Sequence, residues 1–169
     1  KNLKEINGGL FDPEITGGIN GTNWSHVKLE EEMPNPLFED AILKLLDIKS
    51  SDFNAIVSGK KKVKGKTGGA LIKDMLSKID VEKDIKMLEE KITKRKKTEK
   101  DKAYKKLKIL RALREQNLDP TVYMMKSVPV LPPHFRPLTI KENGDFSSND
   151  LNGLYKDIGA VNTTLQKQI

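Results

Sequence analysis

Apolar residues recur at helical spacing in the middle of the chain, and they predict two helices that pack against each other. The first helix carries a seam with spacings of four, three and four residues: Val81, Ile85, Leu88 and Ile92. The second carries a return seam: Ala103, Leu107, Leu110 and Leu113. Seams of this heptad-like kind bury one helix against another. Because only a short joint separates them, the two helices are expected to form an antiparallel hairpin.

Weaker patterns on both sides of the hairpin predict a small mixed body. Helical spacing runs through residues 37–46 and 70–79. Residues 24–30 alternate between polar and apolar side chains, as in a half-buried strand. Residues 121–130 also favour a strand, which Pro129 would confine to the edge of a sheet. The chain is therefore predicted to be α+β and mostly helical.

A proline-dense stretch follows, with four prolines in the nine residues 129–137. Each proline fixes φ and lacks an amide donor, so the stretch excludes both a helix and a sheet interior. Asn143-Gly144 then predicts a tight turn, and Ser147 with Asp150 predicts the start of a last helix. Three apolar residues of that helix are expected to be packed: Leu151, Leu154 and Ile158.

These patterns divide the chain into five segments. They are an amino-terminal body over 1–58, a basic glycine-rich linker over 59–69 that is expected to be mobile, a basic helical hairpin over 70–118, a strand with a proline-rich loop over 119–148, and the start of a helix over 149–169. The hairpin is expected to protrude from the small mixed body. The chain starts at Lys1 rather than Met and stops at Ile169 inside a helical pattern, so we expect a piece of a larger protein.

Positive charge is concentrated in one region. Residues 60–114 hold 21 of the 31 Lys and Arg residues but only 8 of the 24 acidic ones, and the whole chain carries a net charge of +7. The densest cluster lies at the joint of the predicted hairpin: Lys94, Arg95, Lys96 and Lys97. A basic excursion of this kind is a candidate footprint for nucleic acid. A solvated helical surface explains the same composition equally well, because Lys is a good helix former.

The residues needed for catalysis or metal binding are missing from the sequence. There is no Cys, which excludes disulfides and thiolate zinc sites, and there are only two His residues. His26 stands alone on its predicted strand, and the adjacent Glu30, Glu31 and Glu32 would point in different directions. No catalytic residue and no metal ligand is therefore predicted. No apolar run reaches the length of a membrane span, so a soluble, cytoplasmic protein is expected.

Two neighbouring motifs resemble a known family. Residues 128–138 read V-P-V-L-P-P-H-F-R-P-L, and residues 148–155 read S-N-D-L-N-G-L-Y. They resemble V-P-V-L-P-P-x-x-R-P-L and S/N-D-L-N-x-L-Y of the beta-prime subunit of multisubunit DNA-directed RNA polymerases. Residues 9–17 and 69–80 are similar to two further motifs of that family. The resemblance implies the amino-terminal clamp and lid region, in which a clamp closes over DNA and a lid helps to peel RNA from the template.

The resemblance also implies site residues and partners. The lid would cover about residues 137–148, where Phe146 could stack on a base or wedge beside it, or could instead pack under the loop. Arg136 and Lys141 could contact phosphates, and Arg136 could alternatively brace the clamp through a carboxylate. The implied partners are template DNA, nascent RNA and other polymerase subunits, especially a beta-like one. The chain would carry no active site itself, while the complete nucleotidyltransferase would need magnesium.

The chain departs from the family pattern at two places. Residues 24–29 are similar to the family's G-H-I-E-L motif, and only residues 18–23 connect them to the motif over residues 9–17. The family usually inserts a four-cysteine zinc ribbon at this point, so no zinc is expected. Val161 stands at the usual position of an arginine, which argues against standard sigma-factor binding and leaves another initiation factor open. A shortened, cysteine-free and lysine-rich version of this region resembles divergent viral polymerases of the phage type, which would place the protein in the host cytoplasm. The alternative function is a stand-alone basic coiled-coil adaptor that binds RNA or a protein partner.

Overall fold

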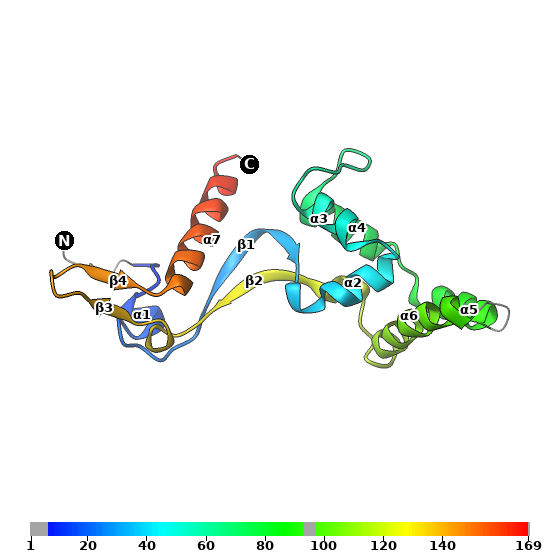
Figure 1. Cartoon of the computed structure of the whole chain (residues 1–169), viewed down its shortest axis with the longest axis horizontal. Coiled ribbons are helices and arrows are strands. Elements are labelled where there is room, and N and C mark those ends of the chain that lie inside the picture. Colours follow the sequence, from blue (N-terminus) through cyan, green and yellow to red (C-terminus); the bar gives the residue numbers. More distant parts are fainter. Residues whose placement is uncertain (1–6, 93–96, 169) are drawn as a thin grey trace. The chain divides into compact units, whose positions relative to one another are not determined.

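The computed structural model describes residues 7–92 and 97–168, without the side chains of Lys97, Thr98 and Phe146. Helices predominate, and the described strands form two sheets of two strands each (Figure 1). The predicted α+β, mostly helical class is therefore confirmed. Contacts divide the chain into two compact units, one of residues 31–125 and one of residues before 31 and after 125. The division runs within the paired strands β1 (Ser25–Pro34) and β2 (Met124–Val130).

The unit of residues 31–125 is helical. Its elements are η1 (Pro36–Phe38), α2 (Glu39–Leu46), α3 (Ser50–Val57), α4 (Gly68–Ser77), α5 (Val81–Ile92), α6 (Lys97–Glu115) and η2 (Pro120–Tyr123). One hydrophobic core runs through it, and its most deeply buried members include Ile42, Ile72, Leu76 and Leu110. The Asn35 side chain caps η1 by accepting a hydrogen bond from the Leu37 amide at 3.1 Å, as expected for Asn before Pro at a helix start.

Helices α5 and α6 form the predicted hairpin. The return seam of Ala103, Leu107, Leu110 and Leu113 is buried, and so are Ile85 and Ile92 of the first seam. A surface ion pair of 2.7 Å between Glu89 and Arg111 also links the two helices. Helix α4 packs instead against α2 and α3, so the hairpin begins near residue 81 rather than at residue 70.

The expected linker over residues 59–69 has a defined structure. Val63 and Lys66 pair as an isolated antiparallel bridge around Lys64 and Gly65, whose φ angles are 51° and 79°. Two left-handed residues in succession are the signature of a tight hairpin turn. The last two residues of the segment, Gly68 and Gly69, already belong to α4. The segment is therefore a hydrogen-bonded loop, where composition alone indicated a featureless linker.

The second unit contains α1 (Pro13–Thr16), η3 (Pro133–Phe135), β3 (Leu138–Ile140), β4 (Phe146–Ser148) and α7 (Asp150–Gln166), together with most of β1 and β2. Strands β3 and β4 pair antiparallel, with Leu138 opposite Ser148 and Ile140 opposite Phe146. The proline-rich segment thus continues into a β-hairpin, where the sequence indicated only an irregular loop. Among the described helices, none is long and apolar enough to cross a membrane.

Helix α7 differs from the sequence prediction in its cap and in its packed face. Asn149, not Ser147, is the N-cap, and its side-chain oxygen accepts a hydrogen bond from the Leu151 amide at 2.9 Å. Leu151 and Leu154 are exposed, with 36% and 59% of their surface accessible, so the prediction that they pack is wrong. Polar side chains of α7 face the rest of the unit instead, because they can form hydrogen bonds with backbone groups that the strands and loops leave unpaired.

Residues 18–23 form a tight connection between α1 and β1. The Gly21 amide donates to the Gly18 carbonyl at 3.0 Å, and the Asn23 amide donates to the Thr16 carbonyl at 3.3 Å. A Cβ atom on Gly21 would overlap the Thr16 carbonyl oxygen and the Gly17 carbonyl carbon. Both are backbone atoms, which cannot move aside as the end of a flexible side chain can.

Gly21→Ala should therefore destabilise the chain by about 1–3 kcal/mol, the usual cost of inserting a methyl group into a filled space. Gly153→Ala is the matched control, because a Cβ there meets nothing within 4 Å. Replacing this exposed helical glycine with alanine should instead stabilise the chain by about 0.5–1 kcal/mol. Urea denaturation of the two variants measures the difference, and equal stabilities would contradict the crowding at Gly21.

Candidate nucleic-acid interface

A buried arginine joins three segments of the second unit. Arg136 follows η3 and has no solvent-accessible surface. Its guanidinium donates to the Leu131 carbonyl at 2.7 Å, to the Asn152 side-chain oxygen at 2.9 Å, and to the Leu10 carbonyl. These acceptors belong to the proline-rich segment, to α7 and to the amino-terminal segment. One side chain therefore fixes the positions of all three.

Two aromatic rings accompany the guanidinium. Its central carbon lies 4.8 Å from the centroid of the Phe11 ring and 5.8 Å from that of the Tyr155 ring. Desolvation by burial lowers the pKa of Arg136 below its ordinary value, and the nearby Tyr155 opposes that shift. Arginine still keeps its proton in proteins. The site therefore holds an internal positive charge that oxygen dipoles and ring faces stabilise, with no ion pair to a carboxylate among the described residues.

Further hydrogen bonds hold helix α7 against the segments that Arg136 joins. The Asn152 amide donates back to the Arg136 carbonyl at 3.1 Å, so the two residues form a reciprocal pair. The Tyr155 hydroxyl accepts a hydrogen bond from the Leu131 amide at 3.2 Å. Further along α7, the Asn162 side chain accepts a hydrogen bond from the Glu30 amide and donates one to the Lys28 carbonyl, both at 2.8 Å. Asn162 thus pairs with the backbone of β1 as a neighbouring strand would.

The β3–β4 hairpin extends from this fixed base and has an exposed tip. The Gly144 amide donates to the Lys141 carbonyl at 2.9 Å, and Gly144 takes a left-handed φ of 81°. Asn143 and Asp145 bond each other through their side chains at 2.9 Å. The turn predicted at Asn143-Gly144 is therefore confirmed. Ile140 is 71% exposed on the hairpin, which leaves an apolar side chain open to contact.

The predicted site residues differ in where the structure places them. Arg136 is buried, and each of its three nitrogens donates to a carbonyl or amide oxygen of the chain. The expectation that it contacts phosphate is therefore corrected, as is the alternative of a brace through a carboxylate. Lys141 is exposed at the tip of the β3–β4 hairpin, where a phosphate could reach it. Phe146 lies on β4 opposite Ile140, and its side chain falls outside the described part.

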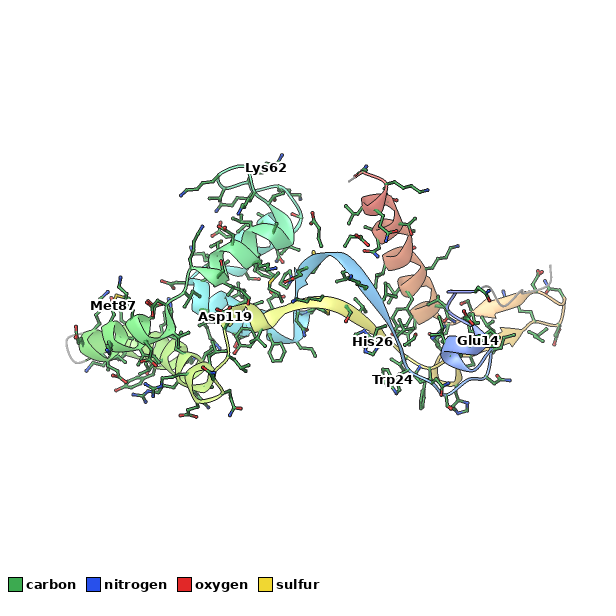
Figure 2. All side chains as sticks on the ribbon, turned by 180° about the vertical axis from the view of Figure 1, so that it is seen from behind. Glu14, Trp24, His26, Lys62, Met87 and Asp119 are labelled. Atoms are coloured by element: carbon green, nitrogen blue, oxygen red, sulfur yellow. The ribbon has the colours of Figure 1, made fainter. Side chains whose placement is uncertain are left out.

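The basic cluster of the helical hairpin lies largely outside the described residues. Lys94, Arg95 and Lys96 fall in the gap between α5 and α6, and Lys97 opens α6 without a described side chain. Within the described ranges, no group of three or more His, Asp or Glu residues is arranged to hold a metal ion. His26 is exposed on β1 (Figure 2).

Sequence reasoning missed the central role of Asn152 and the structured loop at Val63–Lys66. A signal existed for both. Asn152 interrupts an apolar helix pattern with a polar side chain, which requires a partner wherever it is buried. Lys64-Gly65 between two paired residues is a compatible sequence for a two-residue hairpin turn, since glycine tolerates positive φ.

The chain is similar in sequence to parts of much longer proteins. It is 37% identical over 116 residues, or 68% of its length, to the DNA-directed RNA polymerase subunit beta′ of Acinetobacter baylyi. It is 34% identical over 100 residues to that of Leptospira biflexa and 32% identical over 102 residues to that of Acholeplasma laidlawii, about 60% of the chain in each case. These matches span only 7–8% of the relatives' own length. No protein-family model matches the chain.

The fold is of the α+β, mostly helical class, with a buried arginine at the centre of one of its two units. The sequence relatives make the assignment more specific, and they confirm the resemblance that the motifs indicated. The chain contains a region like the beta-prime subunit of multisubunit DNA-directed RNA polymerases.

Arg136→Met should destabilise the chain by about 3 kcal/mol or more, because it leaves several oxygen acceptors without their donor. Arg111→Met is the matched control, since its half-exposed ion pair with Glu89 is worth at most about 1 kcal/mol. Urea denaturation compares the two variants. A cost for Arg136→Met no larger than that of the control would show that the buried guanidinium does not hold the unit together.

Proposed function

We propose that this chain is the non-catalytic clamp and lid part of an RNA polymerase beta-prime subunit. One observation carries the proposal. The two motifs most characteristic of the resemblance, residues 128–138 and 148–155, meet in space through the reciprocal bonds between Arg136 and Asn152. That contact gives a physical reason for the arginine of the first motif and the asparagine of the second. It fixes the base of the β3–β4 hairpin, which is the proposed lid.

A lid that separates strands must resist bending, and the geometry of this unit fits that requirement. Prolines on both sides of η3 reduce the conformational freedom of the lid base. Arg136 joins that base to the amino-terminal segment and to α7, the start of the proposed clamp helix. The exposed Lys141 at the tip would contact phosphate, and Phe146 would stack on or wedge beside a base at the end of the RNA–DNA hybrid.

The implied assembly follows from the same proposal. The segment would work with other polymerase subunits, especially a beta-like one, on template DNA and nascent RNA in the cytoplasm. Nucleotide transfer with magnesium would take place in the complete enzyme, outside this segment.

The direct connection over residues 18–23, in place of a zinc ribbon, supports a divergent version of the phage type. Val161, which is 62% exposed where the family has an arginine, argues for an initiation factor other than a standard sigma.

In the complete enzyme, Phe146→Ala should increase persistent RNA–DNA hybrid at the upstream end, because the proposed wedge loses its ring. Phe135→Ala is the matched control, since it removes the same kind of ring from an exposed position of the proline-rich segment that lies outside the β3–β4 hairpin. Nuclease mapping of hybrid length on stalled complexes measures the effect. Unchanged strand separation in Phe146→Ala would exclude the wedge role.

The joint of the helical hairpin should bind duplex DNA through phosphates. Replacing Lys94, Arg95 and Lys96 together with Gln should weaken binding. It should also reduce the slope of the logarithm of the affinity against the logarithm of the salt concentration by about 2.7, roughly 0.9 per lost phosphate contact. Fluorescence anisotropy across a salt series measures both quantities. A flat salt response of the unmodified chain would leave the hairpin as a scaffold.

The alternative function, a basic coiled-coil adaptor, has one observation in its favour. The α5–α6 hairpin packs its two helices along a heptad-like seam, as coiled-coil interaction modules do. The two functions differ in what the β3–β4 hairpin contributes. An adaptor would keep its activity when residues 138–148 are replaced by a short turn, whereas a polymerase that depends on this lid would lose normal strand separation.

A further inference from the structure

The loop over residues 59–67 presents a cluster of lysines on a defined support. Five of its residues are lysines and none is acidic: Lys60, Lys61, Lys62, Lys64 and Lys66. Lys61 is paired with Asp52 at 2.7 Å and Lys66 with Asp74 at 2.8 Å. The other three make no hydrogen bond or ion pair with the described residues, and all are exposed. Figure 2 shows Lys62 at the outer edge of this loop.

The paired lysines act as anchors of the loop. The hydrogen bond and charge of Lys61 hold the pKa of Asp52 below its ordinary value. Hydrogen bonds from Lys66 and Lys78 lower the pKa of Asp74 to about 2. Both carboxylates therefore stay charged at neutral pH, and each already has a lysine partner. The two carboxylates that pair with lysines of the loop are thus already occupied, and neither forms an ion pair with Lys60, Lys62 or Lys64.

Backbone bonds complete the support of the loop. The Thr67 hydroxyl lies between the Lys61 and Ile56 carbonyl oxygens, at 2.9 and 3.1 Å, and the Lys61 amide donates to the Ala55 carbonyl at 2.8 Å. Together with the turn at Lys64-Gly65, these bonds fix where the loop backbone runs. Lysines on a fixed backbone lose less conformational freedom on binding than lysines on a free chain.

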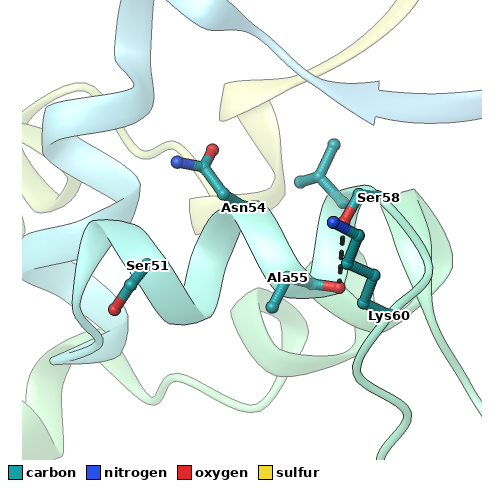
Figure 3. A pocket seen from close by; sticks show the side chains of 6 residues that line it. Ser51, Asn54, Ala55, Ser58 and Lys60 are labelled. Atoms are coloured by element: carbon teal, nitrogen blue, oxygen red, sulfur yellow. Dashed lines mark hydrogen bonds between the residues drawn. The ribbon is translucent and has the colours of Figure 1, made fainter.

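A shallow hollow lies beside the loop, on the exposed face of α3. Its lining includes Ser51, Asn54, Ser58 and Lys60 (Figure 3). The Ser58 hydroxyl makes only a long bond of 3.4 Å to the Ala55 carbonyl. Two hydroxyls, an amide and an ammonium group can each donate to a phosphate oxygen. The hollow therefore extends the lysine cluster with neutral donors of the kind that contact nucleic-acid backbones.

The chemistry of the surface favours nucleic acid over a protein partner. Protein interfaces are enriched in aromatic residues and arginine and are depleted in lysine. The loop has neither an aromatic residue nor an arginine, and Val63 is its one large apolar side chain. Lysine acts as a point charge that attracts phosphate without requiring a fixed geometry, so such a surface binds backbone irrespective of base sequence.

We propose that the loop over residues 59–67 and the exposed face of α3 form a second nucleic-acid contact, which holds a phosphodiester backbone through Lys60, Lys62 and Lys64. The proposal rests on the proposed function in one respect, namely that the chain acts on nucleic acid. It is separate from the lid and from the basic joint at residues 94–97. Duplex DNA and single-stranded RNA both carry this backbone, and the test distinguishes them.

The test replaces Lys60, Lys62 and Lys64 with Gln in the full chain. Fluorescence anisotropy then measures the affinity for labelled duplex DNA and for labelled single-stranded RNA over a salt series. Losing three phosphate contacts should reduce the salt slope by about 2.7 for the duplex or about 2.1 for the single strand. The nucleic acid with the larger loss is the one that this contact holds. The control replaces Lys28, Lys156 and Lys167, which changes the net charge equally and should alter the slope by less than about 1.

A second variant tests the defined turn. Gly65→Ala keeps every charge but strains a residue at a φ of 79°, so it should weaken binding several-fold while circular dichroism stays unchanged.

Equal slopes for the loop and control triple variants would overturn the contact while leaving the proposed function intact. Equal competition by poly-glutamate and by duplex DNA at matched charge would overturn it in favour of an acidic protein partner. No binding of either nucleic acid by the unmodified chain would overturn both proposals.

Discussion

The second unit depends on the burial of one guanidinium. Without Arg136, the amino-terminal segment, the proline-rich segment and α7 would meet with unpaired carbonyl groups and a gap between the Phe11 and Tyr155 rings. Burying a charge is costly unless its donors are used, and here named partners take them. The same planar fork reaches several acceptors at once, which a lysine could not do. This constraint explains why the unit can be stable with few buried apolar side chains.

The two units solve the problem of stability in different ways. Residues 31–125 bury a continuous apolar core through α2, α3, α4 and the α5–α6 hairpin. The unit around Arg136 uses polar contacts instead: a buried Asp12 that caps α1, Asn152 against Arg136, and Asn162 against β1. Hydrogen bonds are directional and apolar contacts are not. The polar unit is therefore suited to holding the β3–β4 hairpin in one orientation, as a strand-separating element would require.

The lysines of the chain also divide into those that support the structure and those that are exposed for binding. Lys61 and Lys66 pair with carboxylates and support a loop, while Lys60, Lys62 and Lys64 are exposed on the surface of that loop. The proposed contacts to nucleic acid at Lys141 and at this loop involve exposed side chains that build no core. At these two places the proposed binding and the folding depend on different residues, which allows each to be tested by substitution without loss of the other.

The sequence by itself determined the α+β class, the two seams of the hairpin and the turn at Asn143-Gly144, because helical periodicity and turn chemistry are local properties. It also carried the motifs that identify a beta-prime-like region. Tertiary structure alone decided that Arg136 is internal and that Asn162 rather than Leu154 holds α7 against the rest of its unit. Both depend on partners distant in the sequence, Leu10 for Arg136 and Lys28 for Asn162, and no local pattern names those partners.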